Sequence, residues 1–178
     1  MKKGFTLIEL LIVIAILAIL TTTVVLVLNP ASMLAKARDS QRLADMDSLR
    51  SAISLYLATA SAPTITALGP WSQGPSANKN CWSLHIVTCA EKDNYAVDGT
   101  GWVGIKLSDT PGGSPLAILP RDPSNTLAYH YAYGAESTNK TFELNAVLES
   151  PDNAPKMQND GGDSLTVYEI GTYPGLTL

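Results

Sequence analysis

The chain has 178 residues, a hydrophobic fraction of 46% and a formal net charge of −4. This length allows one modest domain beside a membrane segment, and the hydrophobic fraction is typical of a globular chain that carries such a segment. The acidic balance argues against nucleic acid as the main partner.

The N-terminal part, residues 5–28, is apolar except for Thr6, Glu9 and three threonines at 21–23. As an α-helix this segment would be about 36 Å long, and a bilayer's hydrocarbon core is about 30 Å thick. Lysines at positions 2 and 3 precede it. Because lysine prefers the cytoplasmic side, we expect the N-terminus inside the cell and the following domain outside.

Two simpler interpretations of this segment are a cleaved secretory signal and a plain signal anchor. The apolar part of a secretory signal is usually about 7–15 residues long, and small residues mark its cleavage site. The apolar run here is longer and leads directly into Asn29 and Pro30. Both alternatives are therefore less favoured than a specialised membrane helix.

Glu9 is the residue that a plain anchor does not explain. A charged side chain at the centre of a membrane helix costs about 2.5–3.5 kcal/mol on insertion scales, and such residues are usually paired and functional. The apolar segment contains no basic residue. We therefore expect the partner of Glu9 to come from outside this helix.

The string KGFTLIEL at residues 3–10 resembles the leader junction of type IV pilins and of the pseudopilins of type II secretion. The resemblance is strong from Met1 to about Ala60 and looser beyond. It implies that a prepilin peptidase cuts between Gly4 and Phe5 and that Phe5 is then N-methylated. It also implies that Glu9 neutralises the terminal amine of Phe5 in a neighbouring subunit during assembly.

The resemblance implies an α+β, type IV pilin-like fold, in which a long N-terminal helix packs on a small antiparallel β-sheet. The half of the helix nearer the N-terminus would lie in the membrane, and the other half would be amphipathic. The expected divisions are a leader (1–4), a transmembrane or filament-core helix (5–29), an amphipathic half-helix (30–60) and a globular β-rich head (61–178).

Asn29 and Pro30 predict an interruption of the long helix, as a kink or local melting, since proline removes one backbone hydrogen bond and clashes with the preceding turn. Residues 31–60 contain no Gly or Pro and read as an amphipathic helix. Opposite charges follow one another at i,i+3 spacing, which favours ion pairs on the helix surface. These charges are Asp39, Arg42, Asp45, Asp47 and Arg50, and the apolar face near the end is Leu49, Ile53, Tyr56 and Leu57.

Residues 61–80 are rich in Pro, Gly, Ser and Asn and predict an irregular loop. Cys81 and Cys89 follow, and an exported domain lies in an oxidising compartment, so we expect a disulfide between them. Two buried thiols are the alternative. A metal site with His85 is disfavoured by the long gap between the cysteines.

Short strands are expected over residues 94–98, 102–107, 127–133, 141–149 and 165–170, separated by Gly and Pro clusters. Alternation in the third of these places three tyrosines on one face. Alternation in the fourth does the same for four apolar side chains. The two sets are Tyr129, Tyr131 and Tyr133, and Phe142, Leu144, Ala146 and Leu148.

The segment before the tyrosines is similar to the head of pseudopilin-like proteins, in which a Pro-x-Asp-Pro turn leads into a strand with alternating tyrosines. The matching residues are Pro120, Asp122, Pro123, Tyr129 and Tyr131. Ser124 and Asn125 stand where the major pseudopilin has Trp-Gly, so the resemblance does not assign the subfamily.

No catalytic residues are predicted, and we do not expect an enzyme. The two histidines, His85 and His130, lie in strand-like segments without a Ser-His-Asp arrangement. Residues 99–104 fit the pattern G-x-G-x-x-G, but a strand and turn, not a helix, are expected to follow, so nucleotide binding is disfavoured.

The stretch NDGGDS at residues 159–164 places two acids among glycines. A polar turn before the last strand is the simpler interpretation. The alternative is a structural calcium site with Asp160 and Asp163 as ligands, because oxygen-rich loops suit Ca²⁺ and related pseudopilins bind calcium near the C-terminal loop. No other cofactor is expected.

The favoured function is a structural subunit of a pilus-like filament, assembled from the inner membrane and displayed at the cell surface. The partners that the resemblance implies are further copies of the chain, the prepilin peptidase, an assembly ATPase and an inner-membrane platform protein. One alternative is a pseudopilin of a type II secretion system. Another is a membrane-anchored binding protein that never polymerises, for which Glu9 would be dispensable.

Overall fold

The computed structural model describes residues 4–65, 71–73 and 90–175. By its internal contacts the chain divides into two compact units, residues 1–37 and 38–178. The division falls within helix α2 (Pro30–Thr59).

The first unit contains helix α1 (Leu7–Leu28) and the first two turns of α2. The side chains of residues 7–24 are all exposed, as expected for a helix that is apolar on every side and has no soluble core to join. Asn29 separates the two helices and adopts the left-handed conformation, with φ 38°. Its carbonyl accepts a hydrogen bond from the backbone N–H of Ser32 at 3.0 Å, which starts α2.

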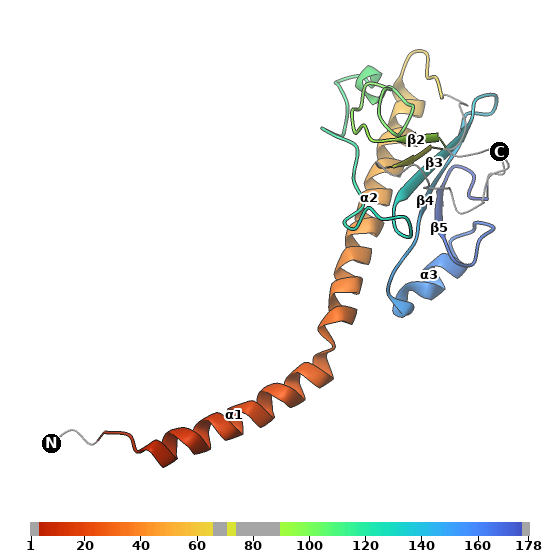
Figure 1. The fold of residues 1–178 in the computed structure, drawn as a ribbon. Helices are drawn as coiled ribbons and strands as arrows, with labels where there is room; N and C mark the ends of the chain where they lie inside the picture. Colours follow the sequence, from red (N-terminus) through yellow and green to blue (C-terminus); the bar gives the residue numbers. More distant parts are fainter. Residues whose placement is uncertain (1–3, 66–70, 74–89, 176–178) are drawn as a thin grey trace. The chain divides into compact units, whose positions relative to one another are not determined.

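The second unit is built on a five-stranded sheet with the order β2-β1-β3-β4-β5 (Figure 1). The pairs β1–β3, β3–β4 and β4–β5 are antiparallel, whereas β1 and β2 run parallel. The strands are β1 (Trp71–Gln73), β2 (Ala90–Lys92), β3 (Tyr131–Glu136), β4 (Thr141–Ala146) and β5 (Tyr168–Gly171). The fold class is therefore α+β and pilin-like, as predicted. The four strands β1, β3, β4 and β5 form the antiparallel part of the sheet, and the edge strand β2 pairs in parallel with β1.

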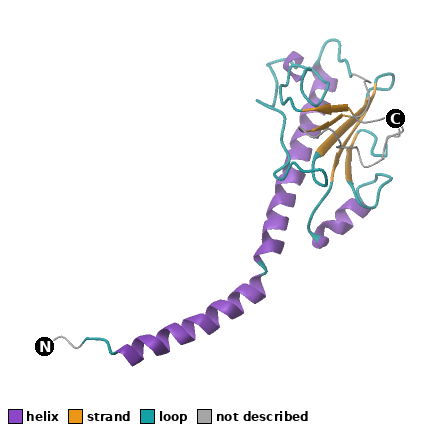
Figure 2. Cartoon of the chain, viewed as in Figure 1, coloured by secondary structure: helices purple, strands orange, loops and turns teal. Residues whose placement is uncertain are grey.

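Three short helical segments lie in the connections between strands of the described part of this unit, one between β2 and β3 and two between β4 and β5 (Figure 2). They are η1 (Leu107–Asp109), η2 (Pro151–Asn153) and α3 (Ala154–Gln158). The last two follow β4 and bring the chain back to β5.

The core lies between α2 and one face of the sheet. Tyr133, Leu144 and Ile170 form one cross-strand row of this face, through the pairs Tyr133–Leu144 and Leu144–Ile170. From the helix, Leu49, Ile53 and Tyr56 are each at most 1% exposed and join the same cluster, and Leu57 is partly buried against it, which confirms the predicted apolar face. Fully burying a side chain of this size contributes about 1.5–3 kcal/mol.

The predicted apolar face of residues 141–149 is buried, since Phe142, Leu144, Ala146 and Leu148 are at most 4% exposed. The strand itself ends at Ala146, so Leu148 lies beyond β4. The tyrosine prediction was correct for Tyr131 and Tyr133. Tyr129 lies before β3 begins, in an irregular segment. The tyrosines alternate with other residues from Tyr129 onward, but β3 begins only at Tyr131. The predicted strand was therefore too long at its start.

Residues 94–98 and 102–107 are not strands, contrary to the prediction. A single isolated bridge joins Asp98 and Lys106. The side chain of Asn94 accepts a hydrogen bond from the Ala96 N–H, and that of Asp98 accepts one from the Thr100 N–H, so local polar groups compete with a ladder. The predicted irregular stretch 61–80 also contains a strand, β1.

The second face of the sheet is polar and yet buried. Glu143, Asn145 and Glu169 are at most 1% exposed, and Asn145 lies directly opposite Glu169 in the β4–β5 pairing. Burial raises the pKa of Glu169 to about 8, with the negative charge of Glu143 acting in the same direction. Sequence alternation could place these residues opposite the core but could not show that the face is covered.

Candidate assembly site

The start of α1 is organised by Thr6 and Glu9. Thr6 is the N-cap, and its backbone N–H and its hydroxyl donate to Glu9 Oε2 at 2.8 and 2.7 Å. The Glu9 N–H donates in return to Thr6 Oγ1 at 3.3 Å, which completes a capping box. This arrangement satisfies two N–H groups that have no partner within the helix.

Glu9 therefore has polar partners inside its own chain, the backbone N–H and hydroxyl of Thr6. From the sequence we expected a partner only from outside the helix. The capping-box pattern Thr6-x-x-Glu9 could have revealed this, since a threonine followed three residues later by a glutamate is its signature. The hydrogen bonds recorded over residues 4–65 engage Oε2 alone, so Oε1 is left to accept a donor from elsewhere. This additional partner is compatible with the predicted role in assembly.

The predicted processing point lies just before this cap. Gly4, Phe5 and Thr6 are outside the helix and exposed, and Phe5 is 84% exposed. A methyl group built on Gly4 would meet nothing within 4 Å. An extended, accessible peptide is the form that a peptidase needs, so the geometry suits the predicted cleavage between Gly4 and Phe5. Lys2 and Lys3 lie outside the described residues.

The three threonines of α1 do not present free hydroxyls at the surface of the helix. Thr21 donates to the carbonyl of Leu17 at 2.7 Å, and Thr22 donates to that of Ala18 at 2.8 Å. The Thr23 hydroxyl is shared between the carbonyls of Ile19 at 3.0 Å and Leu20 at 2.8 Å. Because their polar groups are satisfied within the helix, these residues are compatible with an apolar environment.

By length and composition, the stretch Leu7–Val24 could cross a membrane, with a mean hydropathy of 2.7. Together with the motif reported below, this exposed apolar helix suggests membrane anchoring. The helix ends before the predicted kink. Pro30 is the first residue of α2, and the left-handed Asn29 separates the two helices, so the chain has a break there rather than a bend within one helix.

The head contains a second ordered cluster, formed around Arg42 of α2. Its guanidinium contacts Asp122 Oδ2 at 2.6 Å and Asp39 Oδ1 at 3.0 Å. It also contacts Glu149 Oε1 at 2.7 Å and lies over the ring of Tyr129 at 4.9 Å. Burial lowers the pKa of Arg42, but the carboxylates of Asp122 and Glu149 more than offset this and raise it.

The remaining acceptors of this Arg42 cluster are satisfied by the backbone. Asp39 accepts the N–H groups of Glu149 and Ser150, each at 2.8 Å. Hydrogen bonds from Arg38, followed by those from Arg42, lower the pKa of Glu149 to about 2. Buried charges are tolerated only with such pairing, so the Arg42 cluster fixes α2 to the segment that follows β4.

The Pro-x-Asp-Pro turn contributes Asp122 to this cluster. Asp122 is 3% exposed, and its Oδ1 accepts the backbone N–H groups of Ser124 and Asn125. Ser124 also receives a hydrogen bond from Arg42 at 3.1 Å. The two residues that depart from the major-pseudopilin pattern therefore complete the turn around Asp122. The predicted pair Asp39–Arg42 is present, whereas Asp45 bonds instead to Tyr131 and Gln41.

The predicted calcium ligands lie in the loop before β5. Asp160 accepts the N–H groups of Gly162 and Glu169 through its two carboxylate oxygens, and Asp163 is exposed. Each Asp160 oxygen keeps a lone pair, and carboxylate oxygens suit Ca²⁺. Over the described residues, no three His, Cys, Asp or Glu side chains are grouped to hold a metal ion. Backbone carbonyls would have to complete the site, and calcium binding stays a prediction.

The other predicted sites differ in what the structure shows. Cys81, Cys89 and His85 lie outside the described residues, so their disulfide and metal interpretations stay predictions. His130 is fully buried beside β3.

Comparison with known proteins identifies one family model. Residues 1–25 match the prokaryotic N-terminal methylation motif. No curated protein and no solved structure matches the chain. The matched residues include the exposed Gly4–Phe5 junction, the capping box and most of α1. The chain therefore carries the signal of type IV pilins and pseudopilins, on a protein of pilin-like α+β fold.

Proposed function

We propose that this chain is a structural subunit of a type IV pilus-like filament, assembled from the inner membrane. The observation that carries the proposal is the methylation motif on an exposed apolar helix whose first turn holds Glu9. The motif implies processing by a prepilin peptidase and pilus-type assembly. An enzymatic role has no support from the motif.

Cleavage between Gly4 and Phe5 would give Phe5 a cationic amine beside the capping box, and N-methylation would follow. In a filament, the amine of one subunit would meet Glu9 Oε1 of its neighbour. A close ion pair in an apolar surrounding is strongly orienting, although its net energy is offset by desolvation. The pair would therefore set the axial register between subunits, while packing of the α1 helices supplies the hydrophobic stabilisation.

The assembly path requires further components. The unassembled subunit would stay in the inner membrane through α1, with the head on the outer side. An assembly ATPase and a membrane platform protein would extract it and add it to a growing polymer of the same chain. The polymer would end at the cell surface. Nucleic acid is not the expected main partner, because the chain has 16 acidic against 12 basic residues.

A pseudopilin of type II secretion is the second candidate. The Pro120–Pro123 turn supports it, because the resemblance to pseudopilin heads lies there and Asp122 is built into the Arg42 cluster. A pseudopilin would use the same processing and the same Glu9 contact in a short filament. A membrane-anchored binding protein that does not polymerise is the third candidate. Of the three candidates, it is the one for which Glu9 would be dispensable.

Mechanical shearing of cells tests the proposal. The released material is pelleted, and intact mass shows whether the chain is present and where it begins. An abundant chain that starts at methylated Phe5 supports a surface filament. A processed chain that stays in the membrane fraction supports the pseudopilin. A chain that still carries residues 1–4 contradicts both.

Substitution of Glu9 separates the polymer from the anchored monomer. We expect Glu9→Lys to insert into the membrane as the wild type does and to give no filaments. Leu17→Ile, a neutral change on the same helix, is the matched control. Wild-type filament yield from Glu9→Lys would contradict polymerisation through this contact and favour the anchored binding protein.

A further inference from the structure

Arg121 is an exposed arginine whose position is fixed by the turn that contains it. The next residue, Asp122, is buried and holds Arg42 through both carboxylate oxygens, at 2.6 and 3.1 Å. Two backbone N–H groups of the same turn also bond Asp122. The backbone on one side of Arg121 is therefore fixed, while its own side chain lies at the surface.

The side chain of Arg121 is supported from one side by an aromatic ring. Its Cζ lies 5.7 Å from the ring centroid of Tyr95, whose hydroxyl donates to Asp93 Oδ1 at 2.8 Å. Stacking of this kind restricts the guanidinium while leaving its N–H groups for a partner. A planar guanidinium held in place is suited to a carboxylate, which it can bind through two parallel hydrogen bonds.

Asp163 is an exposed carboxylate between two residues whose backbone N–H groups are hydrogen-bonded. It lies in the loop between α3 and β5, where Gly162 donates to Asp160 at 3.0 Å and Ser164 donates to Glu169 at 2.7 Å. Both neighbours of Asp163 are thus hydrogen-bonded through their backbone N–H groups. The loop therefore presents the carboxylate at the surface.

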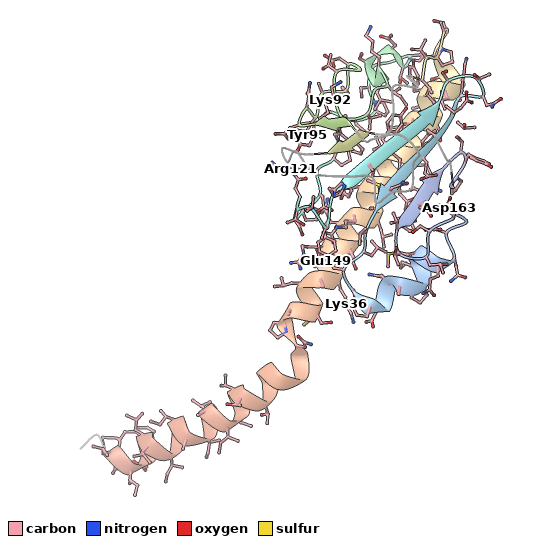
Figure 3. The ribbon with its side chains drawn as sticks, turned by 45° about the vertical axis from the view of Figure 1, so that its right-hand side comes forward. Lys36, Lys92, Tyr95, Arg121, Glu149 and Asp163 are labelled. Carbon is pink, nitrogen blue, oxygen red and sulfur yellow. The ribbon has the colours of Figure 1, made fainter. Side chains whose placement is uncertain are left out.

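Arg121 and Asp163 lie near opposite edges of the head's sheet. Figure 3 shows Arg121 with Tyr95 near the β2 side and Asp163 beside β5, with the sheet between them. Complementary charges on different sides of one subunit cannot pair with each other, but they can join successive copies. Such a contact is heterologous, and repeated without closure it generates a helical filament.

We propose that, in the assembled filament, Arg121 of one head binds the carboxylate of Asp163 in a second copy of this chain. The contact rests on the proposed polymeric function and adds a head-to-head interaction to the pairing at Phe5 and Glu9. It makes the β2 and β5 sides of neighbouring heads adjacent.

Charge reversal tests the pair directly in cells that make the full chain. Arg121→Asp and Asp163→Arg each place like charges together, and we expect each to reduce sheared filament by roughly tenfold or more. The double variant restores opposite charges, and we expect its yield to return to within about threefold of the wild type. Lys156→Glu reverses an exposed charge on α3 and is the matched control, with unchanged yield.

Single variants with wild-type yield would overturn the pair. So would a double variant that assembles no better than either single variant, or a Lys156→Glu control that falls equally. If the wild type is absent from both the sheared filaments and any membrane-bound polymer, the proposed function itself fails. If Glu9→Lys abolishes filaments while the head variants have no effect, only the present proposal fails.

A second measurement does not depend on charge variants folding well. Arg121→Cys and Asp163→Cys, combined in one chain, should give a ladder of disulfide-linked oligomers when filaments are oxidised, and neither single cysteine variant should. A missing ladder in filaments that form normally would overturn the contact.

Calcium at Asp163 would compete with the guanidinium of Arg121 for the same carboxylate. Wild-type yield that is maintained in EDTA supports the arginine, whereas loss of filaments in EDTA would assign the carboxylate to the ion.

Discussion

Arg42 and Asp122 are 80 residues apart in sequence, yet their side chains are both fully buried and in contact, with Arg42 Nε 2.6 Å from Asp122 Oδ2. The contact joins the amphipathic helix to the turn that precedes β3. Through Asp39 and Glu149, the same guanidinium also reaches the segment after β4. The attachment of α2 to the head therefore has a charged part in addition to its apolar face.

Removing the arginine should destabilise the head strongly. Arg42→Met leaves the carboxylates of Asp39 and Asp122 buried without their cation, and breaking a buried pair in this way typically costs about 3–5 kcal/mol. Arg50→Met is the matched control, because Arg50 pairs with Asp47 at the surface and exposed pairs contribute about 0–1 kcal/mol. Denaturant unfolding of the detergent-solubilised chain measures both. Equal losses for the two variants would contradict the assigned role of Arg42.

Acid should weaken the head through Glu149. Its pKa is about 2 in the folded chain, below the ordinary value of 4.5, because it accepts hydrogen bonds from Arg38 and Arg42. A lowered carboxyl pKa contributes stability that is complete above the unfolded pKa and is lost as the pH falls through the folded one. We expect the free energy of unfolding to fall between about pH 4.5 and 2, and Glu149→Gln to flatten this slope. The control Asp47→Asn should keep it, and an identical slope in Glu149→Gln would contradict the assignment.

The capping box predicts a specific effect of Thr6. Thr6→Val removes the hydroxyl that bonds Glu9, and loss of an N-cap typically costs a helix about 1 kcal/mol. We expect faster amide hydrogen exchange in the first turn of α1 and a lower filament yield. Thr6→Ser keeps the hydroxyl and should behave as the wild type. If valine and serine variants exchange and assemble alike, the hydroxyl has no part in presenting Glu9.

Calcium should stabilise the head if Asp160 and Asp163 bind it. A ligand that binds only the folded state at 100 times its dissociation constant adds about 2.7 kcal/mol, which raises the melting temperature by several degrees. We expect this rise on adding calcium to the EDTA-treated chain and its loss in Asp160→Asn. Asp109→Asn, an exposed acid paired with Lys106, should keep it. A melting temperature that is the same in calcium and in EDTA would rule the site out.

The predictable parts of this protein are those that short-range patterns control. The spacing of Leu49, Ile53 and Tyr56 gave the buried face of α2, and the i,i+3 rule gave the pair Asp39–Arg42. The motif at the N-terminus was evident from a few residues around Gly4 and Glu9. Each of these depends on neighbours within two helical turns.

The partners of Arg42 that are distant in sequence, Asp122 and Glu149, could not be found in this way. Asp122 lies 80 residues away, and the backbone of Ser150 reaches Asp39 across 111 residues. Nothing in local spacing distinguishes Asp122 from an exposed turn acid. The false strand at residues 94–98 has the opposite cause. Its apolar run at residues 95–97 is real, but the side chains of Asn94 and Asp98 accept backbone N–H groups two residues further on.

In the proposed filament, the use of one Glu9 oxygen by the capping box would also affect the kinetics of growth. Because the hydrogen bonds among the described residues engage Glu9 Oε2 alone, an incoming amine could bind Oε1 while the helix start keeps these bonds. Joining would then involve no exchange of partners within the capping box. The activation barrier for adding a subunit would come from stripping water from the amine and from moving the helix, and a subunit that dissociates would leave its neighbour ready to accept the next one.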